Sequence, residues 1–110
     1  MKSDTIYLRH MLEAIQKTEQ YLSGVTYETF CEDSMILDAV MKELEIIGEA
    51  CSKLSKGFRT KHREIPYRDA IDMRNFLIHE YFGVRKDVVW ATCKNDLPPL
   101  KQTIQKFLEE

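Results

Sequence analysis

The sequence has little of what several classes of small protein depend on. No run of apolar residues approaches the ~18 that cross a membrane, and the opening stretch, MKSDTIYLRH, has no apolar segment of the kind a secretory signal requires. We therefore expect a cytoplasmic protein without a membrane partner. The three cysteines, Cys31, Cys51 and Cys93, form no Cys-x-x-Cys pair, so neither a disulfide framework nor a zinc site is indicated. We expect them to be small buried or half-buried apolar residues.

Glycine and proline are also scarce, with four and three residues in a chain of 110. Linkers and low-complexity tracts are rich in such residues, and none is visible here. The length is near the commonest domain size, so residues 1–110 are expected to form one domain. No segment alternates apolar and polar residues with the period of a strand, which favours an all-α fold.

Apolar residues recur instead at helical spacing. In the second long segment, Val40, Leu44, Ile47, Cys51 and Leu54 step by four and three residues. This pattern predicts helical segments along the whole chain, with a short helical turn at 26–30. The long segments are expected at about 3–23, 34–56, 65–83, 86–95 and 97–107.

Single residues punctuate this pattern. Gly48 interrupts the second segment at a cost of about 1 kcal/mol relative to alanine, which predicts that another helix approaches there closely. Ser3 or Asp4 is expected to cap the first helix, Gly57 to end the second, and Asp96 to cap the last.

The charge is nearly balanced, at −2 with an isoelectric point of about 5.9. A general nucleic-acid binder is usually basic, so any nucleic-acid contact must be local. One basic run, KLSKGFRTKHR at 53–63, contains five lysines and arginines and no acid. Two interpretations stay open: a solvated helix end and loop, or a nucleic-acid contact.

Polar residues crowd the otherwise apolar stretch RNFLIHEYFGV, residues 74–84. At about 100° per residue, Asp72, Asn75 and His79 share one face, and Arg74 lies roughly 140° from His79. One regular helix therefore cannot direct Arg74 and His79 to a common point. The helix could distort or end near His79, the arginine could wrap around it, or a second copy of the chain could supply the partner across a two-fold axis.

Histidine and arginine together suit cleavage of a phosphodiester. Histidine moves protons near neutral pH, and the planar guanidinium matches phosphate oxygens. RNA carries its own 2′-hydroxyl nucleophile, so this chemistry needs neither a metal ion nor a cofactor. The alternative is structural, with Arg74 paired to Asp72, Glu80 or an acid on another helix.

MRNFLIHEYFGV resembles the R-x4-H-x-Y motif of the HepT-like branch of the HEPN superfamily, which Arg74, His79 and Tyr81 fill here. The resemblance covers nearly the whole chain. Its other segments are ELEIIGEA (43–50), IPYRDAIDMRN (65–75) and VVWATCKNDLPPL (88–100).

The resemblance implies an all-α, antiparallel HEPN-like bundle of four to five helices that forms a symmetric homodimer, and association into a higher oligomer is left open. It implies a toxin that cleaves RNA without a metal, with Arg74 and His79 catalytic and Asn75 in support. The implied partner is a minimal nucleotidyltransferase antitoxin of the MntA type, which silences the toxin by attaching AMP to Tyr81.

Two other functions are weighed against this one. The first is a non-enzymatic subunit that binds a nucleotide or the nucleotidyltransferase, which the acidic net charge favours. The second, a di-iron bundle, needs a glutamate three residues before a histidine. Those positions hold Tyr7, Arg59 and Phe76, so a metal site is not expected.

Overall fold

The computed structural model describes residues 2–79 and 83–109, and within these residues every regular element is helical. The all-α prediction is therefore confirmed for the part of the chain that is described. Four helices are longer: α1 (Lys2–Leu22), α3 (Ser34–Lys53), α5 (Tyr67–His79) and α7 (Leu97–Leu108). The shorter elements are α2 (Tyr27–Glu32), α4 (Lys56–Lys61), α6 (Lys86–Ala91) and a π-helical segment, η2 (Thr92–Asp96).

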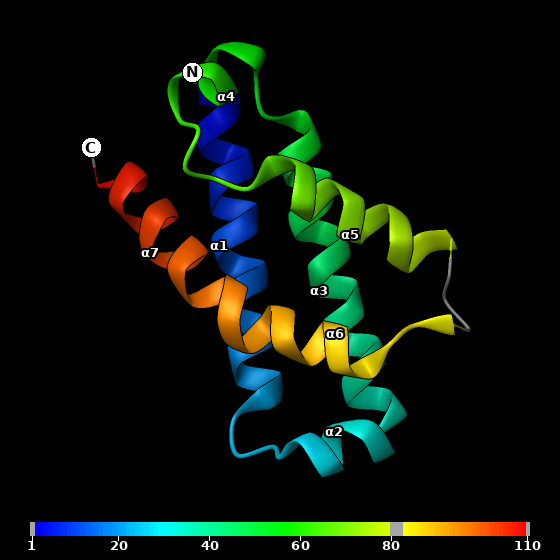
Figure 1. Cartoon of the computed structure of the whole chain (residues 1–110). Coiled ribbons are helices and arrows are strands. Elements are labelled where there is room, and N and C mark those ends of the chain that lie inside the picture. Colours follow the sequence, from blue (N-terminus) through cyan, green and yellow to red (C-terminus); the bar gives the residue numbers. More distant parts are fainter. Residues whose placement is uncertain (1, 80–82, 110) are drawn as a thin grey trace.

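An antiparallel pair, α1 and α3, forms the centre of the fold (Figure 1). Gly24, with a φ of +72°, follows α1 and permits a turn that other residues rarely adopt. Asp33 then caps α3 by accepting hydrogen bonds from the backbone of Met35 and Ile36. α5 crosses α3, and the run from α6 to α7 crosses the same pair in the opposite direction (Figure 1).

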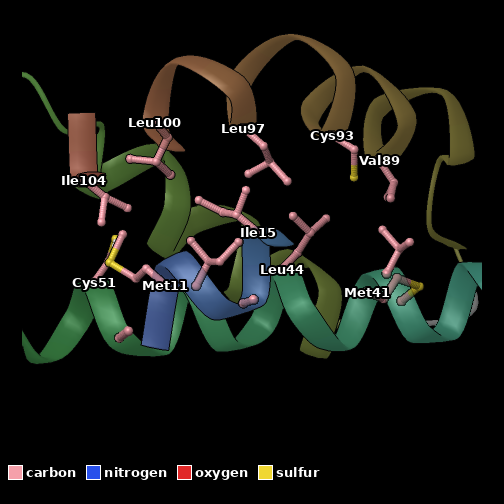
Figure 2. Close-up of a cluster of buried hydrophobic side chains, with 14 of the residues drawn as sticks. Met11, Ile15, Met41, Leu44, Cys51, Val89, Cys93, Leu97, Leu100 and Ile104 are labelled. Atoms are coloured by element: carbon pink, nitrogen blue, oxygen red, sulfur yellow. Dashed lines mark hydrogen bonds between the residues drawn. The ribbon is translucent and has the colours of Figure 1, made fainter. Parts of the chain in front are cut away.

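Apolar side chains from these layers meet in a single cluster (Figure 2). Leu97 of α7 points towards Ile15 of α1 and Leu44 of α3, and Ile104 points towards Cys51 of α3. These contacts are what the helical spacing of the leucines and isoleucines predicts. Cys51 and Cys93 are buried and Cys31 is half-buried, as expected. Burial raises the pKa of the Cys51 and Cys93 thiols to about 12.

The predicted break before the last helix is wrong. The backbone stays helical from Lys86 to Leu108, passing through η2. Asp96 makes no side-chain capping bond, and the backbone N–H of Leu97 bonds to the carbonyl of Thr92. Pro98 and Pro99 lack N–H donors, so the continuous helical run makes no backbone hydrogen bond from these two residues.

The middle of the basic run, Lys56–Lys61, forms a separate helix, α4, which the sequence did not predict. Gly57 lies inside this helix and does not end α3. Ser55 caps α4 by accepting a bond from Phe58 N–H, and it donates to the carboxylate of Asp4 with both its backbone N–H and its hydroxyl, each at 2.7 Å. Asp4 therefore ties α1 to α4. The predicted cap at Ser3 or Asp4 is wrong, because α1 begins at Lys2 and both residues lie inside it. None of the described helices is long and apolar enough to cross a bilayer.

The close approach predicted at Gly48 is confirmed. A Cβ atom added there would lie 2.5 Å from the Cβ of Arg74 and 2.7 Å from the carbonyl oxygen of Ala70, both on α5. We expect Gly48→Ala to lower the free energy of unfolding by about 1–3 kcal/mol, because two backbones must move apart. Urea denaturation measures this.

Gly57→Ala is the matched control. No atom lies within 4 Å of a Cβ built on Gly57, and its φ is not positive. This substitution in α4 should leave stability unchanged or raise it by up to about 1 kcal/mol. Equal stability of Gly48→Ala and wild type would contradict the assignment of Gly48 as the contact point.

Candidate active site

The α5 helix carries the polar residues singled out in the sequence, and Gly48 lets it sit directly on α3. Its Leu77 is fully buried, while Asp72, Asn75 and His79 are exposed. The predicted shared face of these three residues is therefore confirmed, and it is the open face of the helix.

Arg74 lies on the other side of α5, folded over α3, with its side chain 18% exposed. Its Nη1 donates to a carboxylate oxygen of Glu49 at 2.7 Å and to the hydroxyl of Ser52 at 3.3 Å. Its Nε and Nη2 both donate to Oδ1 of Asn75, at 3.1 Å and 3.0 Å. The guanidinium is thus held from two sides, by Asn75 on one and by Glu49 and Ser52 on the other.

The charge on Arg74 is partly balanced by this arrangement. Glu49 is 53% exposed and also lies 3.7 Å from the Nζ of Lys53, so one carboxylate faces two cations. Pairing of Arg74 with an acid on another helix was the structural alternative, and that pairing is present. A fixed guanidinium is at the same time the preorganised donor that phosphate recognition requires, so this contact alone does not separate the two roles.

His79 is the last residue of the described part of α5. Its side chain is exposed, and it makes no hydrogen bond or ion pair with any other described residue. α5 is regular up to this point, so the backbone does not bring Arg74 and His79 together within one chain. An exposed imidazole is free to meet a substrate and to exchange protons with it.

Tyr81, the third residue of the motif, lies outside the described residues, as do Glu80 and Phe82.

Two large apolar side chains flank the open face of α5: Phe76 is 37% exposed and Ile78 is 54% exposed. Ile78 follows Arg74 by four residues and so lies on the same side of the helix.

Sequence reasoning did not identify Glu49 and Ser52 as partners of Arg74. Both follow Gly48 on α3 and lie beside Arg74 only because α5 crosses there. The sequence did contain a signal for Glu49: it directly follows Gly48 in ELEIIGEA, and a glycine inside a helix indicates that another helix lies close by. Among the described residues, no three His, Cys, Asp or Glu side chains gather as a metal site would need.

Comparison with known proteins places these residues in a wider setting. The family model described as ribonuclease HepT-like matches residues 11–107. A Thermococcus cleftensis protein named "Probable ribonuclease HepT" is 41% identical over 106 residues, which is 96% of each chain. A Caldanaerobacter subterraneus protein named as a "Putative RNase" is 36% identical over 110 residues, which is all of this chain and 98% of that one.

A longer relative is similar to this chain over half of its own length. A Methanocaldococcus jannaschii protein named "Gamma-glutamylcyclotransferase and putative RNase" is 41% identical over 111 residues. The present chain spans 50% of that protein's length. No solved structure gives a significant match.

Proposed function

Because the chain belongs to the ribonuclease HepT-like family, we propose that it is a metal-independent endoribonuclease that acts as the toxin of a type VII-like toxin–antitoxin pair. The family match over most of the chain carries this proposal. The anchored guanidinium of Arg74 and the exposed imidazole of His79 support it. RNA is the substrate class, because the 2′-hydroxyl supplies the nucleophile that the site itself lacks.

The proposed reaction is an internal transfer at one phosphate. The 2′-oxygen attacks the adjacent phosphorus while a histidine takes its proton, and the bond from phosphorus to the 5′-oxygen breaks. A histidine returns a proton to that oxygen. The products are a 2′,3′-cyclic phosphate and a 5′-hydroxyl. Arg74 stabilises the negative charge on the phosphate oxygens. The test is RNA cleavage by the purified chain in the presence of a chelator.

Two chains complete this site in our proposal. Arg74 and His79 lie on different sides of a regular helix, so a second α5 across a two-fold axis brings the histidine of one chain towards the arginine of the other. The exposed Ile78 beside Arg74 provides an apolar contact for such an interface.

We therefore expect a homodimer with residues 67–82 near the interface. Light scattering at micromolar concentration should give twice the chain mass of 13.0 kDa, or a multiple of it. Ile78→Glu should reduce the mass towards one chain, because it places a charge in the apolar contact. Ile6→Glu is the control, since Ile6 is an isoleucine of similar exposure (52%) on α1. A monomeric wild type, with RNA present as well, would contradict the two-chain site.

Silencing by a partner enzyme completes the proposal. A minimal nucleotidyltransferase of the MntA type would transfer AMP to Tyr81: the phenol oxygen attacks the α-phosphorus of ATP, pyrophosphate leaves and the phenol proton is released. The attached phosphate adds negative charge near the site and can pair with the guanidinium that otherwise holds the RNA.

One observation favours the second candidate function, a non-enzymatic partner subunit. Most of the donors of Arg74 are already engaged by Glu49, Ser52 and Asn75. An arginine held in this way can serve structure alone. This candidate predicts binding to the nucleotidyltransferase and no RNA cleavage, so the chelator assay separates the two.

A further inference from the structure

A basic hollow of about 360 Å³ lies where the chain passes from α4 to α5. Arg59, Arg63 and Arg68 line it, together with Tyr67, and Asp69 is the one acid in its wall. Arg63 and Arg68 are exposed, and neither forms an ion pair with another described residue. Three guanidinium groups around one hollow give a local concentration of positive charge on a chain whose net charge is −2.

The inner wall of the hollow is fixed by hydrogen bonds. Nη2 of Arg59 donates to the carbonyl of Cys51 at 2.8 Å, and its guanidinium carbon lies 5.7 Å from the centre of the Tyr67 ring. The Tyr67 hydroxyl in turn donates to the carbonyl of His62 at 2.5 Å. Arg59 therefore presents a positioned charge. At the outer wall, Arg63 makes one long hydrogen bond, from its Nε to the carbonyl of Thr60 at 3.4 Å, and its Nη atoms and Arg68 remain available to an anion.

The hollow is aligned with the open face of α5. Arg68 precedes Asn75 by seven residues and His79 by eleven, so the three side chains lie within about 20° of a common line. The rise of the helix separates Arg68 from His79 by roughly 16 Å along that line. Figure 1 shows the start of α5 beside the α4 end of the molecule and its last described turn at the far side.

We propose that Arg59, Arg63 and Arg68 form a second RNA-binding site, which grips a backbone phosphate a few nucleotides from the bond cleaved at His79. This inference rests on the proposed ribonuclease function and adds a substrate requirement. The RNA must be single-stranded and long enough to lie along α5 from the hollow to His79. Backbone phosphate contacts carry no sequence information, so the site contributes affinity and register and leaves sequence choice to other contacts.

Binding is tested in the His79→Ala background, where the RNA stays intact. A fluorescent single-stranded RNA is titrated over a series of salt concentrations, with and without Arg63→Ala and Arg68→Ala together. Losing the grip on this phosphate should make the slope of log affinity against log salt shallower by up to about 0.7, the value for one phosphate neutralised on a single strand. Replacing both arginines with lysine should restore most of the slope, because the charge is kept.

Cleavage gives the second measurement. With active protein, the double alanine variant should raise KM roughly tenfold for a long RNA, because charge-assisted contacts to phosphate are lost, while kcat stays near wild type. Lys17→Ala is the control, since Lys17 is an exposed cation on α1, which packs against α3 and α7. A short RNA that cannot reach the hollow should be cleaved equally by the double variant and the wild type.

The outcomes separate this inference from the function it rests on. If wild type does not cleave RNA and His79→Ala does not bind it, both the ribonuclease function and the second RNA-binding site are overturned. Cleavage by wild type with an unchanged salt slope and KM in the double variant would overturn the second site alone. The same result together with weaker binding of the nucleotidyltransferase would assign the hollow to a protein partner.

Discussion

His79→Ala is expected to slow RNA cleavage by roughly 10²- to 10⁴-fold, the usual contribution of a general acid or base. The side chain is exposed and makes no polar contact with the other described residues, so its removal should change the free energy of unfolding by less than about 0.5 kcal/mol. Initial rates on a labelled RNA in a chelating buffer measure the first quantity, and urea denaturation measures the second.

His10→Ala is the matched control for this prediction. His10 is also exposed, on α1, with its ring 6.1 Å from that of Tyr7. The His10→Ala variant should cleave RNA at the wild-type rate. Equal rates for His79→Ala and wild type would remove His79 from the mechanism, and a large loss of stability in His79→Ala would assign it a structural role.

Arg74 is tested beside His79 because its contacts give it two possible roles. Arg74→Ala should also be severe, since the charge that develops on the phosphate loses a fixed partner. It also leaves Glu49 without its 2.7 Å contact, so its stability must be measured alongside its rate. Glu49→Gln keeps an oxygen acceptor for the guanidinium, and near-normal cleavage by this variant would show that the pair itself is not the chemistry.

Tyr81→Phe is expected to keep most of the cleavage activity and to escape silencing completely. Tyr81 follows His79 by two residues and Arg74 by seven, which places it near both in the sequence of the motif. The substitution removes only the hydroxyl that would accept AMP. Intact mass after incubation with the nucleotidyltransferase and ATP should rise by one AMP group in wild type and stay unchanged in Tyr81→Phe.

Another exposed tyrosine controls for general reactivity. Tyr27 on α2 is 37% exposed, and Tyr27→Phe should be modified to the same extent as wild type. Equal modification of Tyr81→Phe and wild type, or none of the wild type, would contradict the assignment of Tyr81.

The helices that the sequence predicted well are those with a long apolar stripe. α1, α3 and α7 each bury such a face, and burial of a stripe is a property of the segment itself. The closeness of two helices at Gly48 was also predictable, because an interior glycine needs a reason. The residues that this close approach brings together were not predictable, because the partners of Arg74 depend on where α5 crosses α3.

Two local features, α4 and the helical run through η2, were not predicted from the sequence for a different reason. α4 has six residues, which is too short for a period to be visible, and its start is held by Asp4, which lies 51 residues earlier in the chain. The helical run through η2 contains a Leu-Pro-Pro sequence that resembles a break, yet tertiary packing of Leu97 and Leu100 keeps it helical.

The most direct test of the account is the chemical nature of the new RNA ends. Wild type is incubated with RNA in a chelating buffer, and the fragments are identified by mass, with His79→Ala from the same preparation as the control. We expect fragments that end in a 2′,3′-cyclic phosphate and begin with a 5′-hydroxyl, which the variant fails to produce. Fragments with 3′-hydroxyl and 5′-phosphate ends, or equal cleavage by the variant, would contradict this mechanism.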